Sequence, residues 1–231
     1  SVGEMIGPAR LRKIVLSMME YSYHTRESEL SKGFFTMKNG WRVGVSGTFV
    51  CSDSGRVNMR SIGSICIRIA REIKGCAEPV CRRILESGRP VNTLICSSPG
   101  LGKTTLLRDI ARILSDFGYT VGIADERHEI AACIEGVPTL DVGQHTDVID
   151  GCPKGVAMEM LLRSMAPQIL ITDEIGNKDD LDAIRESVRR GVTVIASTHA
   201  GSIDELRSGP LNDICVEKLF GWAVILKGEP G

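Results

Sequence analysis

The residues with the clearest chemistry form a glycine-rich run that ends in Gly102, Lys103 and Thr104. The run follows the apolar stretch 94–96 and leads directly into a sequence with helical periodicity. A turn of this kind points several backbone N–H groups and the positive end of the helix dipole at one place. Because Lys103 adds a full positive charge there, the segment predicts a phosphate-binding loop.

The run matches the Walker A pattern except at its start, where Ser97 stands in place of the usual first glycine. In such a loop the amides of residues 100–104 surround the phosphates, and Lys103 reaches the β- and γ-phosphate oxygens. Thr104 would bind Mg²⁺ and Thr105 would face the α-phosphate. The predicted nucleotide-binding residues are Ser98, Pro99, Gly100, Leu101, Gly102, Lys103, Thr104 and Thr105. An ordinary glycine-rich turn with an exposed lysine is the alternative.

Two carboxylates, Asp173 and Glu174, follow the apolar run 167–172. They stand where a buried parallel strand opens into a site at its carboxyl end. As a Walker B pair, Asp173 would hold Mg²⁺ through water or through Thr104, and Glu174 would orient and deprotonate the attacking water. Alternatively, the pair supplies the N-cap and first-turn charge of a helix predicted over 177–191.

A third apolar strand, predicted over 192–197, ends in Thr198 and His199. Since parallel strands end at the same edge of a sheet, His199 is expected beside the phosphate loop. There it would bind the γ-phosphate or the attacking water and report whether the phosphate is present. The spacing also fits a histidine that merely lies near the start of the helix predicted from about Ser202.

An acidic segment that begins with Asp125 and Glu126 follows the strand predicted over 120–124. It is expected at the same sheet edge as the other polar pairs. Glu126 or Asp125 would contact water bound to Mg²⁺, and Arg127 would contact a neighbouring subunit. The alternative for this segment is a solvated charged turn.

The elements that must position these residues alternate between helix and buried strand from about residue 76, which is typical of a parallel α/β sheet. Helices are predicted around 80–85, 106–114 and 156–165, and a final strand over 219–226. Residues 1–75 differ, since a helix from Pro8 precedes a hairpin with turns at 39–40 and 53–55. We therefore expect a small α+β domain over 1–75 and an α/β domain over 76–231.

The composition is that of a soluble protein, with 42% hydrophobic and 25% charged residues among 231. The net charge of -1 gives no general attraction to nucleic acid or anionic lipid, and no apolar stretch is long enough to cross a bilayer. The eight cysteines show no C-x-x-C spacing, which favours reduced thiols and a cytoplasmic compartment. The chain starts at Ser1, and we expect it to be part of a longer protein.

With these motifs, and with the segments 124–131 and 146–154, the chain resembles the stage III sporulation protein AA family over nearly its whole length. That family is similar to the secretion ATPases of type II and type IV systems. The resemblance implies a RecA-like P-loop ATPase core, hexameric rings and hydrolysis of Mg-ATP at subunit boundaries. It also implies a motor for the channel between mother cell and forespore, peripheral at the mother-cell membrane and docked on membrane channel proteins.

The resemblance also assigns residues. It matches the Asp125 segment to an acidic box and His199 to a histidine box, and it implies that arginines of the N-terminal domain complete the nucleotide site. Candidate arginines are Arg60, Arg68 and Arg71. Arg68 is preferred because it alternates with Ile65, Ile67 and Ile69, although a surface salt bridge is the alternative. The predicted catalytic residues are Glu174, Lys103, His199, Glu126 and Arg68.

The leading hypothesis is therefore an oligomeric ATPase that uses ATP and Mg²⁺. A DNA-directed RecA-like ATPase or single-strand-binding module is the second, but it needs a basic and often aromatic groove. Five Phe, three Tyr, two Trp and a near-neutral charge argue against it, and we expect no nucleic-acid partner. A small-molecule kinase is the third, and the Asp173 and Glu174 pair suits activation of water better.

Overall fold

The computed structural model describes residues 6–19, 30, 33–37, 41–51, 57–68, 72–208 and 218–228. The chain divides into two compact units, Ser1–Ala70 and Arg71–Gly231, and each is described by itself. The domain boundary expected after residue 75 falls inside the second unit. The turns predicted at 39–40 and 53–55 lie outside the described residues.

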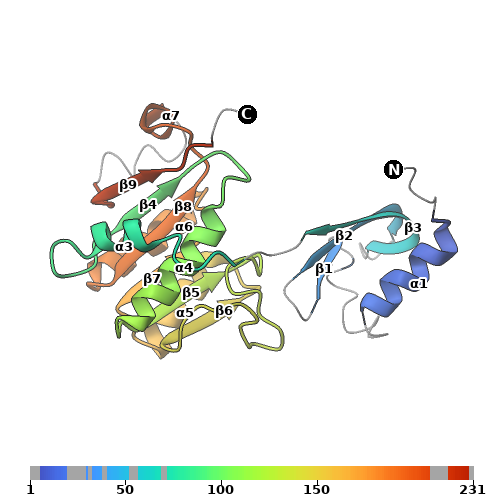
Figure 1. Ribbon diagram of the computed structural model, residues 1–231, viewed down its shortest axis with the longest axis horizontal. Helices are drawn as coiled ribbons and strands as arrows, with labels where there is room; N and C mark the ends of the chain where they lie inside the picture. Colours follow the sequence, from blue (N-terminus) through green and yellow to red (C-terminus); the bar gives the residue numbers. More distant parts are fainter. Residues whose placement is uncertain are drawn as a thin grey trace. The chain divides into compact units, whose positions relative to one another are not determined.

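The second unit is built on a six-stranded sheet with the strand order β6-β5-β7-β8-β4-β9 (Figure 1). Every neighbouring pair of these strands is parallel, so the predicted parallel α/β sheet is confirmed. The strands are β4 (Thr93–Cys96), β5 (Val121–Asp125), β6 (Thr146–Asp150), β7 (Ile169–Thr172), β8 (Thr193–Thr198) and β9 (Trp222–Ile225). Because parallel strands end at the same edge, the segments after β4, β5, β7 and β8 gather there.

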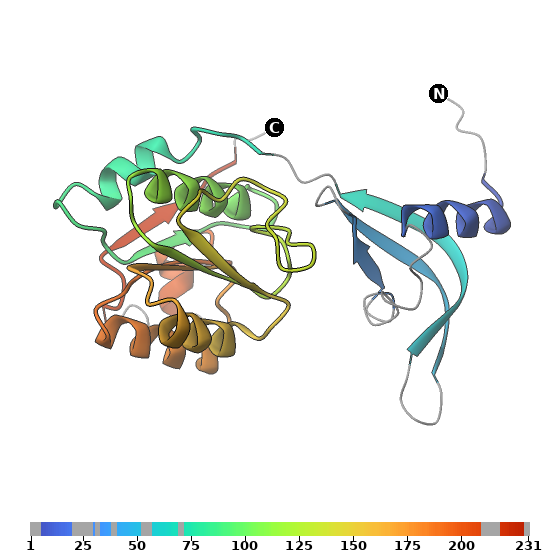
Figure 2. The ribbon, with the colours of Figure 1, turned by 90° about the horizontal axis from the view of Figure 1, so that it is seen from below.

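Helices cover both faces of this sheet (Figure 2). One face carries α3 (Glu78–Ile84) and α4 (Lys103–Asp116), the other carries α5 (Lys154–Ser164) and α6 (Lys178–Arg189), and α7 (Ile203–Ser208) follows β8. Successive strand residues point to opposite faces, so Leu94 packs in the α5 and α6 cluster and Ile95 in the α3 and α4 cluster. The central strands are therefore apolar at nearly every position.

Local sequence explains where two of these helices begin. α6 starts behind a capping box, in which the Asn177 side chain accepts the Asp180 N–H at 2.9 Å and the Asp180 carboxylate accepts the Asn177 N–H at 3.4 Å. Asn177 therefore caps this helix, and the alternative in which Asp173 and Glu174 begin it is wrong. α4 starts directly after Gly102 and has no side-chain cap.

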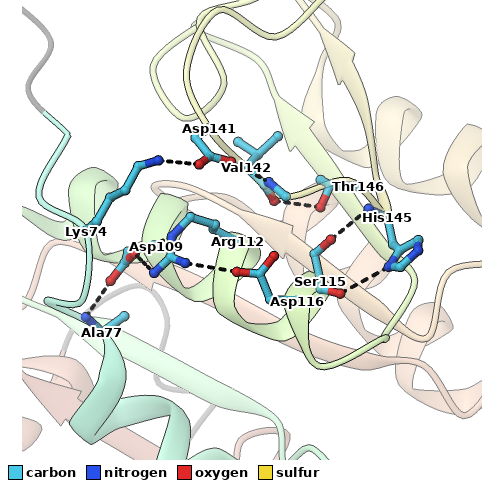
Figure 3. Close-up of polar contacts among 11 residues, drawn as sticks. Lys74, Ala77, Asp109, Arg112, Ser115, Asp116, Asp141, Val142, His145 and Thr146 are labelled. Atoms are coloured by element: carbon cyan, nitrogen blue, oxygen red, sulfur yellow. Dashed lines mark hydrogen bonds and ion pairs between the residues drawn. The ribbon is translucent and has the colours of Figure 1, made fainter.

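A polar network anchors α4 to residues 74–77 and 141–146 (Figure 3). Asp109 accepts the Ala77 N–H at 2.8 Å and two hydrogen bonds from Arg112, and Lys74 pairs with Asp141 at 2.5 Å. Burial acts to raise the pKa of Asp109, but the bonds from Ala77 and Arg112 outweigh it and hold this pKa below its usual range. The helix α4, which follows the phosphate loop, is thus bound to residues 74–77 near the start of the second unit.

The first unit consists of α1 (Pro8–Met18) and an antiparallel sheet with the order β1-β2-β3, which confirms its predicted α+β character. The strands are β1 (Phe34–Thr36), β2 (Arg42–Cys51) and β3 (Val57–Arg68). Val15 of α1 packs with Val43, which lies opposite Ile67 in the register of β2 and β3. Arg68 is exposed and lies on the other strand face. None of the described helices is both long and apolar enough to cross a membrane.

Candidate active site

The glycine-rich loop lies between β4 and α4 and depends on two left-handed glycines. Gly100 has a φ of 80° and Gly102 a φ of 89°, a region that other residues rarely adopt. A Cβ at either position would meet nothing within 4 Å, so backbone conformation, not space, selects glycine. Because α4 has no side-chain cap, its first N–H groups are available to an anion.

Lys103 is buried beneath this loop, with 6% of its surface exposed. Its Nζ donates to the Ser97 and Ser98 carbonyls at 3.0 and 3.2 Å and to the Ser97 hydroxyl at 3.1 Å. Burial lowers the pKa of Lys103, and the Glu174 carboxylate opposes part of that shift. The serine that replaces the usual first glycine therefore helps to hold the lysine, a role that the sequence did not indicate.

Asp173 follows β7 and is 1% exposed. Neither of its carboxylate oxygens has a hydrogen-bond partner among the described residues. Burial, followed by the nearby Asp125 charge, raises the pKa of Asp173 to about 7. A buried carboxylate without donors is stabilised by a bound cation, so Asp173 fits the Mg²⁺ site predicted for it. Thr104, the other predicted ligand, lies in the first turn of α4 and is half-buried.

Glu174 is held by contacts from two segments at the sheet edge, the end of β8 and the loop after β5. Its backbone lies in the left-handed region with a φ of 37°, and its N–H donates to the Ser197 hydroxyl at 3.0 Å. One carboxylate oxygen, Oε1, lies 3.0 Å from His199 Nε2, and the other forms an ion pair with Arg127. The predicted base therefore has a defined orientation.

His199 connects this carboxylate to the phosphate loop. Its Nδ1 lies 3.0 Å from Lys103 Nζ, while its Nε2 faces Glu174. An ammonium group can only donate, so Nδ1 accepts and the ring proton is on Nε2, which donates to Glu174. The structure thus brings three of the predicted catalytic residues into one chain of contacts, Lys103, His199 and Glu174.

The acidic segment after β5 differs from its prediction. Asp125 is fully buried and accepts the backbone N–H groups of residues 129–131 at 2.8, 3.1 and 2.9 Å. Arg108 of α4 closes the same loop by donating to the carbonyls of Glu129 and Ile130. Asp125 therefore shapes the loop through these three hydrogen bonds, and its expected contact with metal-bound water stays a prediction.

The side chains of Glu126 and Arg127 make contacts outside this loop, with Lys154 and Glu174 respectively. Glu126 pairs with Lys154 at 3.1 Å, beside a groove of about 580 Å³ between α5 and α6. The contacts of the described residues do not join Glu126 to the Glu174 cluster, because its carboxylate is directed to Lys154. Arg127 was expected at a neighbouring subunit, but it pairs with Glu174 of its own chain. Long-range pairing of this kind leaves no signal in local sequence.

Arg68, which was predicted to complete the nucleotide site, lies in the first unit at the end of β3. It is exposed and lies opposite Arg42 in the strand register. Arg60 is also exposed on β3, whereas Arg71 lies outside the described residues. The catalytic role of Arg68 stays a prediction.

The parallel sheet, the phosphate loop between β4 and α4 and the acidic pair after β7 define a RecA-like P-loop protein. Comparison with known proteins identifies the family of the chain within this class. The family model described as "Sporulation stage III, protein AA" matches residues 2–231, and the chain belongs to this family.

Individual proteins with similar sequences include one that carries the name of this family. Stage III sporulation protein AA of Bacillus subtilis is 43% identical over 221 residues, which are 93% of this chain and 72% of that protein. Protein SEEDLING PLASTID DEVELOPMENT 1 of Arabidopsis thaliana is 32% identical over 161 residues, 68% of this chain but 23% of that protein.

Solved structures with the same fold include an ATPase and a pilus retraction motor. The Legionella pneumophila ATPase DotB has a TM-score of 0.57 at 18% identity, over 88% of this chain and 57% of that one. The pilus retraction motor PilT with bound ADP has a TM-score of 0.53 at 16% identity, over 90% of this chain and 60% of that one. At these identities the likeness concerns the fold.

Proposed function

We propose that this chain hydrolyses Mg-ATP and works as a homo-oligomeric, hexameric motor of the secretion-ATPase type. Its task would be to power a channel between mother cell and forespore. The observation that carries the ATPase proposal is the chain of contacts Lys103, His199 and Glu174. Next to it in the chain is the buried carboxylate of Asp173, for which the described part of the structure offers no hydrogen-bond partner. A nucleotide-binding loop alone needs no such pre-arranged base.

The proposed binding step uses the loop and Lys103. The backbone N–H groups of residues 100–104 donate hydrogen bonds to the phosphates, and Lys103 exchanges the Ser97 and Ser98 carbonyls for phosphate oxygens. Thr104 and Asp173 would hold Mg²⁺, which supplies neutralising charge to the β- and γ-phosphates. The net cost of moving Lys103 is small, since one set of oxygen acceptors replaces another.

The proposed chemical step uses Glu174 as general base. A water oxygen attacks the γ-phosphorus, Glu174 takes a proton from that water, and the bond between the γ-phosphorus and the bridging oxygen breaks to give ADP and phosphate. His199 holds the first oxygen of Glu174 through its Nε2–H. Lys103 stabilises the charge that develops on the transferred group.

The assembly proposal rests on the family and on the relatives' fold. PilT is described as a motor and DotB as an ATPase, and both share this fold. An arginine from the first unit, Arg68 in our preferred assignment, would complete the site in the same chain or in a neighbouring copy. The motor would sit peripherally at the mother-cell membrane, where membrane channel proteins of the sporulation apparatus would dock it.

The test is ATP hydrolysis by purified protein, followed as phosphate release at several protein concentrations. Lys103→Ala should abolish nucleotide binding, and Glu174→Gln should bind ATP without turnover. Lys178→Ala, on the exposed first turn of α6, is the matched control and should hydrolyse ATP at the wild-type rate. Hydrolysis at the wild-type rate by Glu174→Gln would show that Glu174 is not the general base. Strong stimulation of ATP hydrolysis by single-stranded DNA would favour the DNA-directed alternative.

A native mass measurement with and without an ATP analogue tests the oligomer. A specific rate that rises with protein concentration is expected if sites are shared between protomers. A monomer of constant specific activity at every concentration would contradict the hexameric motor while leaving the ATPase intact.

A further inference from the structure

Both oxygens of the Glu174 carboxylate have a partner. His199 Nε2 lies 3.0 Å from Oε1, and the Arg127 guanidinium pairs with Oε2. The Glu174 side chain is only 22% exposed, so these two contacts largely determine where its oxygens point. A two-point hold fixes the carboxylate plane, whereas either contact alone leaves it free to rotate.

Arg127 lies in a loop that several hydrogen bonds and an ion pair hold in place. The preceding strand ends at Asp125, which binds three backbone N–H groups of the same loop. The neighbouring Glu126 is fixed by its pair with Lys154, which is 6% exposed. The Arg127 side chain itself is 51% exposed, so its removal leaves no cavity and no buried unpaired group. The backbone of Arg127 is thus held in a position from which its guanidinium group contacts Glu174.

The backbone of Glu174 is strained in a way that fits a positioning contact. A glutamate with a φ of 37° lies in the left-handed region, which disfavours residues with a Cβ by about 1 kcal/mol or more. Such a conformation persists only when surrounding contacts hold it. The Ser197 hydroxyl binds the Glu174 N–H, and the side-chain contacts to His199 and Arg127 complete the set.

We propose that Arg127 is a positioning residue for Glu174, whose second carboxylate oxygen it holds so that the first stays bound to His199. This inference rests on the proposed ATPase function and names a residue that acts on its base. Arg127 does not touch nucleotide in this role, so it governs turnover and not affinity. Its action is to keep Glu174, His199 and Lys103 in one contact chain.

The kinetic test compares Arg127→Ala with Arg127→Lys. Loss of a positioning contact should lower kcat about tenfold or more with KM for ATP unchanged, since small displacements of a catalytic group are costly. Lysine retains the charge and should restore most of the rate. Arg163→Ala removes an exposed arginine that pairs with Glu159 on α5, and this matched control should behave as wild type. An unchanged or raised kcat in Arg127→Ala, or a raised KM at unchanged kcat, would overturn the inference.

A second measurement separates this inference from the proposed function, because it needs no turnover. In nucleotide-free protein labelled with ¹⁵N-histidine, His199 should give the shifts of a ring protonated on Nε2, as its contacts require. Arg127→Ala should convert this signal to a mixture of tautomers, and Arg163→Ala should not. A His199 signal that is unmoved by Arg127→Ala refutes the positioning role even in a protein without ATPase activity. A moved signal in an inactive protein would support the contact chain and remove only the ATPase proposal.

Discussion

Lys103 Nζ lies 3.0 Å from His199 Nδ1, and this contact joins the phosphate loop to the residue that holds Glu174. The three protons of the ammonium group are shared among four acceptors, the other three being oxygens of Ser97 and Ser98. A phosphate oxygen competes directly for those protons. In the proposed ATPase, a bound nucleotide would therefore influence Glu174 through the side chain of His199.

His199→Ala tests that connection. Removing the imidazole leaves Glu174 Oε1 without its donor, so we expect kcat to fall about 100-fold, the low end of the range for a group that assists proton transfer. KM for ATP should change little, because the loop amides and Lys103 remain. Steady-state phosphate release measures both.

The matched control is His145→Ala. That ring lies beside the Ser115 carbonyl at the C-terminal end of α4 and contacts no member of the Lys103, His199 and Glu174 chain. It should keep the wild-type kcat. Equal losses in the two variants would mean that His199 serves the fold and not the reaction.

Asp173 should make the metal-free protein less stable as the pH rises. Its pKa is raised to about 7 in the folded state from an ordinary value of 3.8, so folding favours the protonated form. The associated stability is complete below pH 3.8 and is lost as the pH rises through 7, with a limit of about 4 kcal/mol for a shift of this size. Urea unfolding in EDTA at pH 5.5 and 8 measures the loss.

Asp173→Asn removes the titrating group and should flatten this pH dependence. At pH 8 in EDTA the variant should therefore be more stable than wild type, whereas added Mg²⁺ should stabilise only the wild type. A variant less stable than wild type at pH 8 in EDTA would show that the carboxylate has donors in solution.

Features that leave a mark in a few consecutive residues could be predicted from the sequence, and features that depend on distant residues could not. The strand β7 and a helix after the phosphate loop were predictable, because a continuous apolar run and a Gly-Lys-Thr segment are local, although the helix begins at Lys103 and not around residue 106. The strand β6 was not recognised from periodicity, since Asp147 and Asp150 interrupt a partly exposed edge strand. The role of Asp125 depends on N–H groups that fold back to it, and local composition carries no sign of that.

The side-chain contacts that organise the site could not be predicted from the sequence, because they join residues that are far apart in the chain. Arg127 and Glu174 are 47 positions apart, and Lys103 and His199 are 96 apart. Only the strand order, which places β7 between β5 and β8, brings these residues together. Carboxyl ends of adjacent parallel strands identified the edge of the sheet but not which side chains pair across it.

Ser97→Gly tests whether the departure from the usual phosphate-loop pattern is functional. Ser97 is fully buried, and its hydroxyl donates to the Ser98 carbonyl at 2.7 Å while it accepts from Lys103. Losing these bonds and gaining backbone freedom should lower the free energy of unfolding by about 1–2 kcal/mol. ATP should still bind, because the loop amides are retained. Ser87→Gly, at an exposed position outside the loop where the hydroxyl also donates to a nearby carbonyl, is the control, and loss of ATP binding in Ser97→Gly alone would show that the Ser97 hydroxyl is required to position Lys103.

Asp109→Asn tests the anchoring of α4 (Figure 3). The Asp109 carboxylate is 4% exposed and accepts the Ala77 N–H and two bonds from Arg112, so its neutral replacement should cost about 2–3 kcal/mol at pH 7. Since the pKa of Asp109 is held below its usual range, its contribution is present above pH 3.8 and is lost as the pH falls further. Asp116→Asn removes the exposed partner of the same Arg112 and should cost less than about 1 kcal/mol. Urea unfolding at pH 7 and pH 3 measures both variants, and equal costs at pH 7 would mean that the junction at Ala77 is not held by Asp109.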